Sequence, residues 1–154
     1  MFDPMFLAML GGVLALIGGI LGSVFGIAKA ASAGAATLSE DPGQFRSVIV
    51  LASLPMTQTF YGLIIMILII TAVVPKVEAG GNGMAVLAIG LIGFMAEFFS
   101  AIYQGSVCAS GISLLPKTKG QIFTSSMMLA VFVELLGVLG LVFSIMALTM
   151  LGLM

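Results

Sequence analysis

Residues 51–74 read LASLPMTQTFYGLIIMILIITAVV and contain no charged side chain. A run of about 20 apolar residues is long enough to cross the hydrocarbon core of a bilayer as an α-helix. Polar or helix-breaking residues nevertheless gather in its first half, at Pro55, Thr57, Gln58, Thr59 and Tyr61. Because an unpaired polar group in hydrocarbon is costly, these side chains need partners on other segments. The stretch therefore predicts a membrane-spanning helix that forms one wall of a buried polar site.

The whole chain has the composition of an integral membrane protein. Of its 154 residues, 61% are hydrophobic and 7% are charged, whereas a soluble domain carries about 25% charged residues. With a net charge of −1 the chain has no basic patch for phosphates, so nucleic-acid binding is excluded. It contains no His, the commonest metal ligand. Its single cysteine, Cys108, is interpreted as a small packing residue.

Charged residues and helix breakers divide the chain into four apolar runs. These runs cover about 5–38, 47–74, 84–115 and 121–152, and loops 39–46, 75–83 and 116–120 join them. Each run exceeds the roughly 20 residues of a transmembrane helix, and none shows the alternation of a strand. We predict an all-α membrane protein with four transmembrane helices in a single membrane domain (1–154), built as two tandem helical hairpins, 5–74 and 84–152. The first run follows Asp3 instead of a basic segment and is too long for a signal peptide, so we expect a retained helix.

The loop charges predict the orientation in the membrane. Arg46, Lys117 and Lys119 lie at the first and third loops, whereas Lys76 is the only basic residue expected on the opposite side. Because basic loops stay in the cytoplasm, we expect loops 39–46 and 116–120 to be cytoplasmic.

The two halves of the chain resemble each other weakly. When residues 26–35 are placed over 101–110, Lys29 falls on Gln104, and one further residue of offset places Gln58 on Glu134. A duplicated helical hairpin explains this match, and a shared bias toward small residues is the alternative explanation.

Small residues spaced about four apart form a stripe along the first helix and a looser one along the third. Such stripes let a neighbouring backbone approach closely. We expect these two helices to form an inner layer with the second and fourth outside. The length of the stripe favours association between copies of the chain, although a monomeric bundle could also use it. The residues are Gly11, Ala15, Gly19, Gly22, Gly26, Ala30 and Gly34, and then Gly90, Gly93, Ser100, Ala101, Gly105 and Ala109.

Three ionisable residues, Lys29, Glu97 and Glu134, fall inside the predicted spans. Each costs at least about 2.5–3.5 kcal/mol at the centre of a helix and is a functional hypothesis by default. Glu134 has no cation within a helical turn. Counted from the cytoplasmic loops, Gln58, Gln104 and Glu134 all lie roughly 16–20 Å deep, so three helices present polar side chains at one level.

The second helix adds further oxygen atoms at that level. Leu54, Thr57, Gln58 and Tyr61 follow the i, i+3, i+4, i+7 spacing of one helical face. Pro55 removes a helix hydrogen bond and can turn the Leu54 carbonyl toward a ligand. Carboxylate, amide, hydroxyl and carbonyl oxygens suit a hard cation, and one carboxylate is neutralised by a monovalent ion. The pattern predicts a site for Na⁺, or for H⁺ on the glutamate.

These residues make the sequence similar to the proteolipid rotor subunit (K or c subunit) of bacterial V/A-type rotary ATPases, in particular the sodium-translocating type. The similarity covers nearly the whole chain. It is most specific at LPMTQTFYG (54–62), IYQG (102–105) and VELLG (133–137), although the family has glycines where this chain has Met56 and Thr59. It implies that Na⁺ is bound by Leu54 (through its carbonyl), Thr57, Gln58, Gln104 and Glu134, and that Tyr61 hydrogen-bonds to the carboxylate and closes the site.

The resemblance also implies the partners and the function. Identical copies would form a ring in the lipid of a bacterial cell membrane. A stator subunit would carry an arginine, and central-stalk subunits would meet the cytoplasmic loops. ATP hydrolysis on other subunits would turn the ring, so this chain would bind no nucleotide and is not an enzyme on its own. The alternatives are the same ring carrying H⁺, a small oligomeric channel or carrier, and a structural membrane scaffold.

The resemblance does not account for two charged residues. We expect Lys29 to face the inner surface of the ring or a neighbouring copy. Lys29 and Glu97 differ in depth by roughly 13 Å, so we do not expect them to pair. A second carboxylate near the ion path is the only hypothesis that we attach to Glu97.

Overall fold

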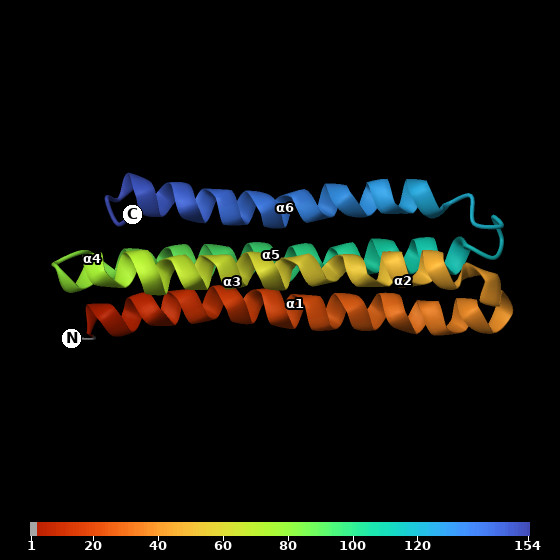
Figure 1. Cartoon of the computed structure of the whole chain (residues 1–154), viewed down its shortest axis with the longest axis horizontal. Helices are drawn as coiled ribbons and strands as arrows, with labels where there is room; N and C mark the ends of the chain where they lie inside the picture. The colour runs from red at the N-terminus through yellow and green to blue at the C-terminus, as the bar shows by residue number, and fades with distance from the viewer. Residues whose placement is uncertain (1–2) are drawn as a thin grey trace.

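The structure, a computed structural model, describes residues 3–154. Within this range the chain forms helices joined by turns. They are α1 (Pro4–Glu40), η1 (Pro42–Gln44), α2 (Phe45–Ser53), η2 (Leu54–Met56), α3 (Thr57–Leu68), η3 (Ile69–Val73), α4 (Val74–Glu78), α5 (Gly83–Leu114) and α6 (Phe123–Met150). Four stretches are long and apolar enough to cross a membrane, since Pro42–Glu78 acts as one span beside α1, α5 and α6. The predicted all-α fold with four transmembrane helices is confirmed (Figure 1).

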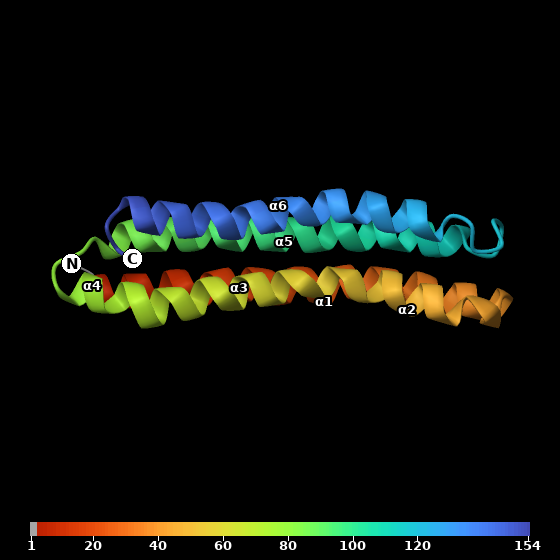
Figure 2. The same ribbon diagram turned by 45° about the horizontal axis from the view of Figure 1, so that its top comes forward.

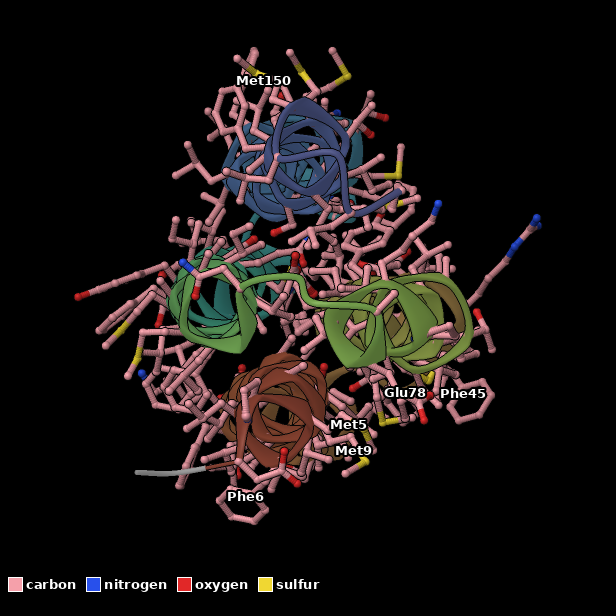
Figure 3. All side chains as sticks on the ribbon, turned by 90° about the vertical axis from the view of Figure 1, so that its left-hand side faces the viewer. Met5, Phe6, Met9, Phe45, Glu78 and Met150 are labelled. Carbon is pink, nitrogen blue, oxygen red and sulfur yellow. The ribbon has the colours of Figure 1, made fainter. Side chains whose placement is uncertain are left out.

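The helices pair as two hairpins. Figure 2 shows α1 beside the second span and α5 beside α6, as the sequence predicted. Viewed end-on, α1 and α6 lie farthest apart, with α5 and the second span between them (Figure 3). Large apolar side chains point outward all along the bundle, for example Phe6, Phe45 and Met150. This surface matches a lipid environment.

Local polar residues start the long helices at their observed ends. Asp3 accepts a hydrogen bond from the Met5 backbone N–H at 3.0 Å and caps α1. Asn82 accepts from the backbone N–H groups of Met84 and Ala85 at 3.1 and 3.2 Å and caps α5. Such caps satisfy backbone donors that have no partner within the helix.

Two prolines interrupt the second span. Pro55 cannot donate a backbone hydrogen bond, and the chain tightens there into the 3₁₀ turn η2, which confirms the predicted distortion. Pro75 follows the π-helical turn η3, which the sequence did not predict. The chain then stays helical as far as Glu78, beyond the predicted end at residue 74.

The small-residue stripe of α1 packs inside the chain. An added Cβ atom at Gly11 would lie 2.8 Å from the Val86 carbonyl oxygen of α5, and one at Gly22 would lie 2.7 Å from that of Phe98. The two helices are therefore in backbone contact, which confirms their close approach. Within one copy of the chain, α5 and the second span bury this stripe, which is the second of the two uses that the sequence allowed.

Two apolar cores fill the bundle, one toward each end. The first gathers residues such as Ala15, Ile65 and Val86, and the second gathers residues such as Leu51 and Ile112. Cys108 is fully buried in the second core, as its interpretation as a packing residue required. Along each span, the polar residues near the middle fall between the residues of the first core and those of the second core.

Candidate cation-binding site

Each oxygen of the Glu134 carboxylate accepts one side-chain hydrogen bond. The Tyr61 hydroxyl donates to Oε1 at 2.9 Å, and the Gln104 side-chain amide donates to Oε2 at 3.1 Å. The two donors come from α3 and α5, so the carboxylate of α6 ties three helices together. These two donors fix the position of the carboxylate between the helices.

The surroundings of Glu134 differ on its two sides. The residue is half-buried, whereas its neighbours Phe132, Leu135 and Leu136 are 63, 47 and 61% exposed. The carboxylate therefore lies at the edge of the bundle, behind an apolar outer face.

The amide of Gln58 links the second span to α5. Gln58 is fully buried, and its Nε2 donates to the Gln104 Oε1 at 2.9 Å and to the Ser100 Oγ at 3.0 Å. Ser100 in turn donates to the Val133 carbonyl oxygen at 3.0 Å. A continuous chain of hydrogen bonds thus runs from Gln58 through Gln104 to Glu134.

Three oxygen atoms meet at the turn beside Pro55. The Thr57 hydroxyl lies 3.2 Å from the Leu54 carbonyl oxygen and 3.2 Å from the Gln58 Oε1. A hydroxyl has one hydrogen to donate, so it serves one of these acceptors at a time. The 3₁₀ turn keeps the Leu54 carbonyl at the start of α3, next to the two side chains.

The structure brings the predicted site residues together. They are connected through the contacts described above: Leu54, Thr57, Gln58, Tyr61, Gln104 and Glu134. One detail differs from expectation, because Gln104 presents its amide nitrogen to Glu134 and its oxygen to Gln58. Thr59 faces away and hydrogen-bonds to Ser23 on α1, as its position on another helical face required.

Sequence reasoning missed Ser100, which joins Gln58 to the backbone of α6. The pattern of small residues assigns it only to the stripe of the third helix. The usable signal is its position four residues before Gln104, which places both side chains on one face of α5. A hydroxyl on that face, opposite a predicted ligand, is a ready partner for an amide.

The two remaining ionisable residues make no hydrogen bond to this network among the described residues. Lys29 is exposed on α1 and donates to the Ser106 Oγ at 3.2 Å. It therefore does not pair with Glu97, as expected from their depths. Glu97 is fully buried on α5, and neither of its carboxylate oxygens has a hydrogen-bond partner among the described residues.

The chemistry of the site is that of cation binding. One carboxylate, amide and hydroxyl oxygens and a backbone carbonyl gather among three helices, within the described residues of a chain that has no His. Oxygen ligands of this type suit hard cations. Neither a nucleophile paired with a base nor a phosphate-binding loop accompanies them in this network.

Comparison with known proteins gives matches along most of the chain. The sequence model of the family of ATP synthase C subunits matches twice, over residues 10–69 and 87–147. The A-type ATP synthase subunit K of Methanocaldococcus jannaschii is 34% identical over 148 residues, which cover 96% of this chain and 64% of that relative. This chain therefore spans less than two thirds of that relative's length. The V-type sodium ATPase subunit K of Enterococcus hirae is 32% identical over 124 residues, which cover 77% of this chain and 75% of the relative.

Proposed function

The chain belongs to the family of ATP synthase C subunits, and on that premise we propose that it is an ion-carrying rotor-ring subunit of a V/A-type rotary ATPase. The observation that carries the proposal is the hydrogen-bond network that joins Glu134 to Tyr61, Gln104 and Gln58 at the edge of the bundle. Hydrogen-bond donors hold this carboxylate on its inner side, and its outer side lies close to the lipid-facing surface. A cation can therefore reach and leave it from that outer surface.

We propose Na⁺ as the ion. The Leu54 carbonyl, the Thr57 hydroxyl and the Gln58 amide oxygen lie next to the carboxylate network, and a proton on Glu134 would need none of them. The relative named V-type sodium ATPase subunit K supports the same choice. One Na⁺ neutralises one carboxylate, whereas a divalent ion would leave a net positive charge in a medium of low dielectric.

In this proposal Gln104 changes partners when the ion binds. Its amide nitrogen now donates to Glu134, and a half-turn about the last side-chain bond exchanges nitrogen and oxygen. The oxygen would then face the cation beside the carboxylate, and the Gln58 amide would lose Gln104 as an acceptor and keep its hydrogen bond to the Ser100 Oγ. Tyr61 keeps its hydrogen bond to Glu134 and covers the site on the lipid side, so that the neutralised carboxylate can move through the membrane as the ring turns.

The partners follow from the same proposal. Copies of the chain form the ring, and a stator subunit supplies an arginine that displaces the cation from Glu134. The turns after α1 and after α5 lie at one end of the bundle, opposite the chain termini (Figure 1). This end carries Arg46, Lys117 and Lys119, which supports a cytoplasmic position where central-stalk subunits can dock.

Carbodiimide labelling of the purified assembly tests the ion. The reagent modifies a protonated carboxyl group, so Glu134 should be labelled slowly in the presence of Na⁺ and faster in its absence. Labelling at equal rates with and without Na⁺, at one pH, would assign the proton instead. Glu134→Gln provides the control, because the labelled mass on α6 should disappear.

ATP-driven transport tests the proposed role as an ion-carrying rotor subunit. Membrane vesicles that contain the whole complex should take up Na⁺ on addition of ATP, and Glu134→Gln should abolish uptake. Uptake that survives this substitution would refute an ion-carrying role and favour a structural scaffold. Passive Na⁺ flux through the purified chain without ATPase subunits would favour an oligomeric channel.

A further inference from the structure

Glu97 is a second buried carboxylate that the proposed site does not use. Its side chain is 0% exposed, and both of its oxygens lack a hydrogen-bond partner among the described residues. An ionised carboxylate that is isolated in a low-dielectric interior is strongly destabilising, and the penalty is several kcal/mol per ion. Either a proton or a metal cation must therefore neutralise it.

The basic side chains of the chain do not supply that charge. Lys29 donates to Ser106, which lies nine residues after Glu97 on α5, or roughly 13 Å along the helix axis. Arg46, Lys117 and Lys119 belong to the end of the bundle where α1 and α5 finish, and Lys76 lies in α4 at the opposite end. A cation that binds Glu97 must come from outside the chain.

The carboxylate points at a glycine surface on α6. A Cβ atom added at Gly137 would lie 2.8 Å from the Glu97 Oε2, and one added at Gly140 would lie 3.5 Å from its Oε1. The Ser100 Oγ lies 3.1 Å from the same Gly137 position. Two carboxylate oxygens and one hydroxyl oxygen therefore border one small region between α5 and α6.

Ser100 can bind a further partner there. Its hydroxyl donates to the Val133 carbonyl and accepts from Gln58, and a hydroxyl oxygen has a second lone pair. A proton on Glu97 would create an O–H donor, but no acceptor lies within hydrogen-bond distance of either carboxylate oxygen among the described residues. A metal cation has no such directional requirement and can bind several oxygens at once.

We propose that Glu97 and Ser100 form a second site for a monovalent metal cation, Na⁺, between α5 and α6 of each copy of the chain. As at Glu134, one Na⁺ neutralises the charge of one carboxylate. The site has its own carboxylate, so the inference does not depend on which ion Glu134 carries. Water would complete the coordination shell, because the protein offers few further oxygens there.

Binding of radioactive Na⁺ to the purified assembly tests the proposal. At saturating Na⁺ we expect Glu134→Gln to retain about one ion per chain and the double variant Glu134→Gln, Glu97→Gln to bind none. The Glu97→Gln variant alone should lose one ion per chain relative to the wild type. Gln is nearly isosteric with Glu, and size-exclusion chromatography before each measurement verifies that the assembly is intact.

The outcomes separate this site from the one at Glu134. If Glu134→Gln binds no more Na⁺ than the double variant, or if Glu97→Gln binds as much as the wild type, the second site is refuted. Na⁺ bound by Glu134→Gln but absent from Glu97→Gln would instead refute Na⁺ at Glu134. Carbodiimide labelling of Glu97 that Na⁺ does not slow would assign a proton to it and overturn the proposal.

A steric variant provides an independent measurement. Gly137→Ala, made in the Glu134→Gln background, places a methyl group 2.8 Å from the Glu97 Oε2. It should weaken the remaining Na⁺ binding at least tenfold, whereas unchanged binding would contradict the geometry. If that variant does not assemble, Glu97→Asp retains the charge, withdraws the oxygens and should also weaken binding.

Discussion

The Tyr61→Phe substitution removes one hydroxyl from the proposed Glu134 site and keeps the ring. The Tyr61 hydroxyl donates to Glu134 Oε1 at 2.9 Å, so this variant deletes one of the two side-chain donors that hold the carboxylate. Hydrogen bonds to a carboxylate of this kind fix its position and are among the stronger ones in proteins. Without the hydroxyl the carboxylate is less firmly oriented toward the ion, so we expect Na⁺ to bind more weakly.

The size of this effect follows from the type of bond. A hydrogen bond to a charged group contributes about 1.5–3 kcal/mol to stability, and roughly 1.4 kcal/mol corresponds to a tenfold change in affinity. Tyr61 and Glu134 are half-buried, so we use the lower end of that range. The Na⁺ concentration that half-protects Glu134 from carbodiimide should therefore rise about tenfold.

A matched control is available on α5. Tyr103 is 59% exposed, and its ring stacks on Phe99 with centroids 6.3 Å apart. Tyr103→Phe removes an equivalent hydroxyl outside the network and should leave Na⁺ protection unchanged. The assigned role of Tyr61 is wrong if the Na⁺ concentration that half-protects Glu134 is the same in Tyr61→Phe as in the wild type. It is also wrong if both variants change that concentration equally.

Three further substitutions test other parts of the structure. Ser100→Ala removes one acceptor of the Gln58 amide, and a lost neutral hydrogen bond of about 1 kcal/mol should weaken Na⁺ protection of Glu134 about fivefold. Gly22→Ala places a Cβ 2.7 Å from the Phe98 carbonyl oxygen, and overpacking of this kind costs about 1–3 kcal/mol. This variant should therefore lower the unfolding temperature in detergent. The control Ala28→Leu adds volume on the exposed face of α1 and should leave the unfolding temperature unchanged. Pro55→Ala restores a backbone donor and should straighten η2, which moves the Leu54 carbonyl and weakens Na⁺ protection without loss of thermal stability. If Na⁺ protection is unchanged in Ser100→Ala or Pro55→Ala, or if the unfolding temperature is unchanged in Gly22→Ala, the structural role assigned to that residue is wrong.

Composition and spacing were sufficient for the architecture. Four apolar runs specify four spans because length and hydropathy alone decide whether a helix can cross lipid. The distortion at Pro55 was also predictable, since a missing N–H acts on its own helix. Both features depend on local chemistry, and neither requires knowledge of which helices touch.

Features that depend on partners could not be predicted in the same way. The stripe of small residues on α1 indicates a close approach, but it does not say whether the other backbone belongs to the same chain. The structure gives the answer at Gly11 and Gly22, which contact α5. Similarly, spacing placed Gln104 at the level of Glu134, but the direction of its amide depends on Gln58, which donates to its oxygen.

The relation between the two hairpins explains why the site has one charge. The weak internal alignment pairs Gln58 with Glu134, yet in the folded chain both side chains join one network through Gln104. Gln58 Nε2 donates to both Gln104 and Ser100, and a carboxylate at this position could donate to neither. It would instead place a second negative group against two acceptors, each of which would lose a hydrogen-bond donor. An amide at position 58 is therefore what allows the first hairpin to act as a ligand wall for the carboxylate of the second.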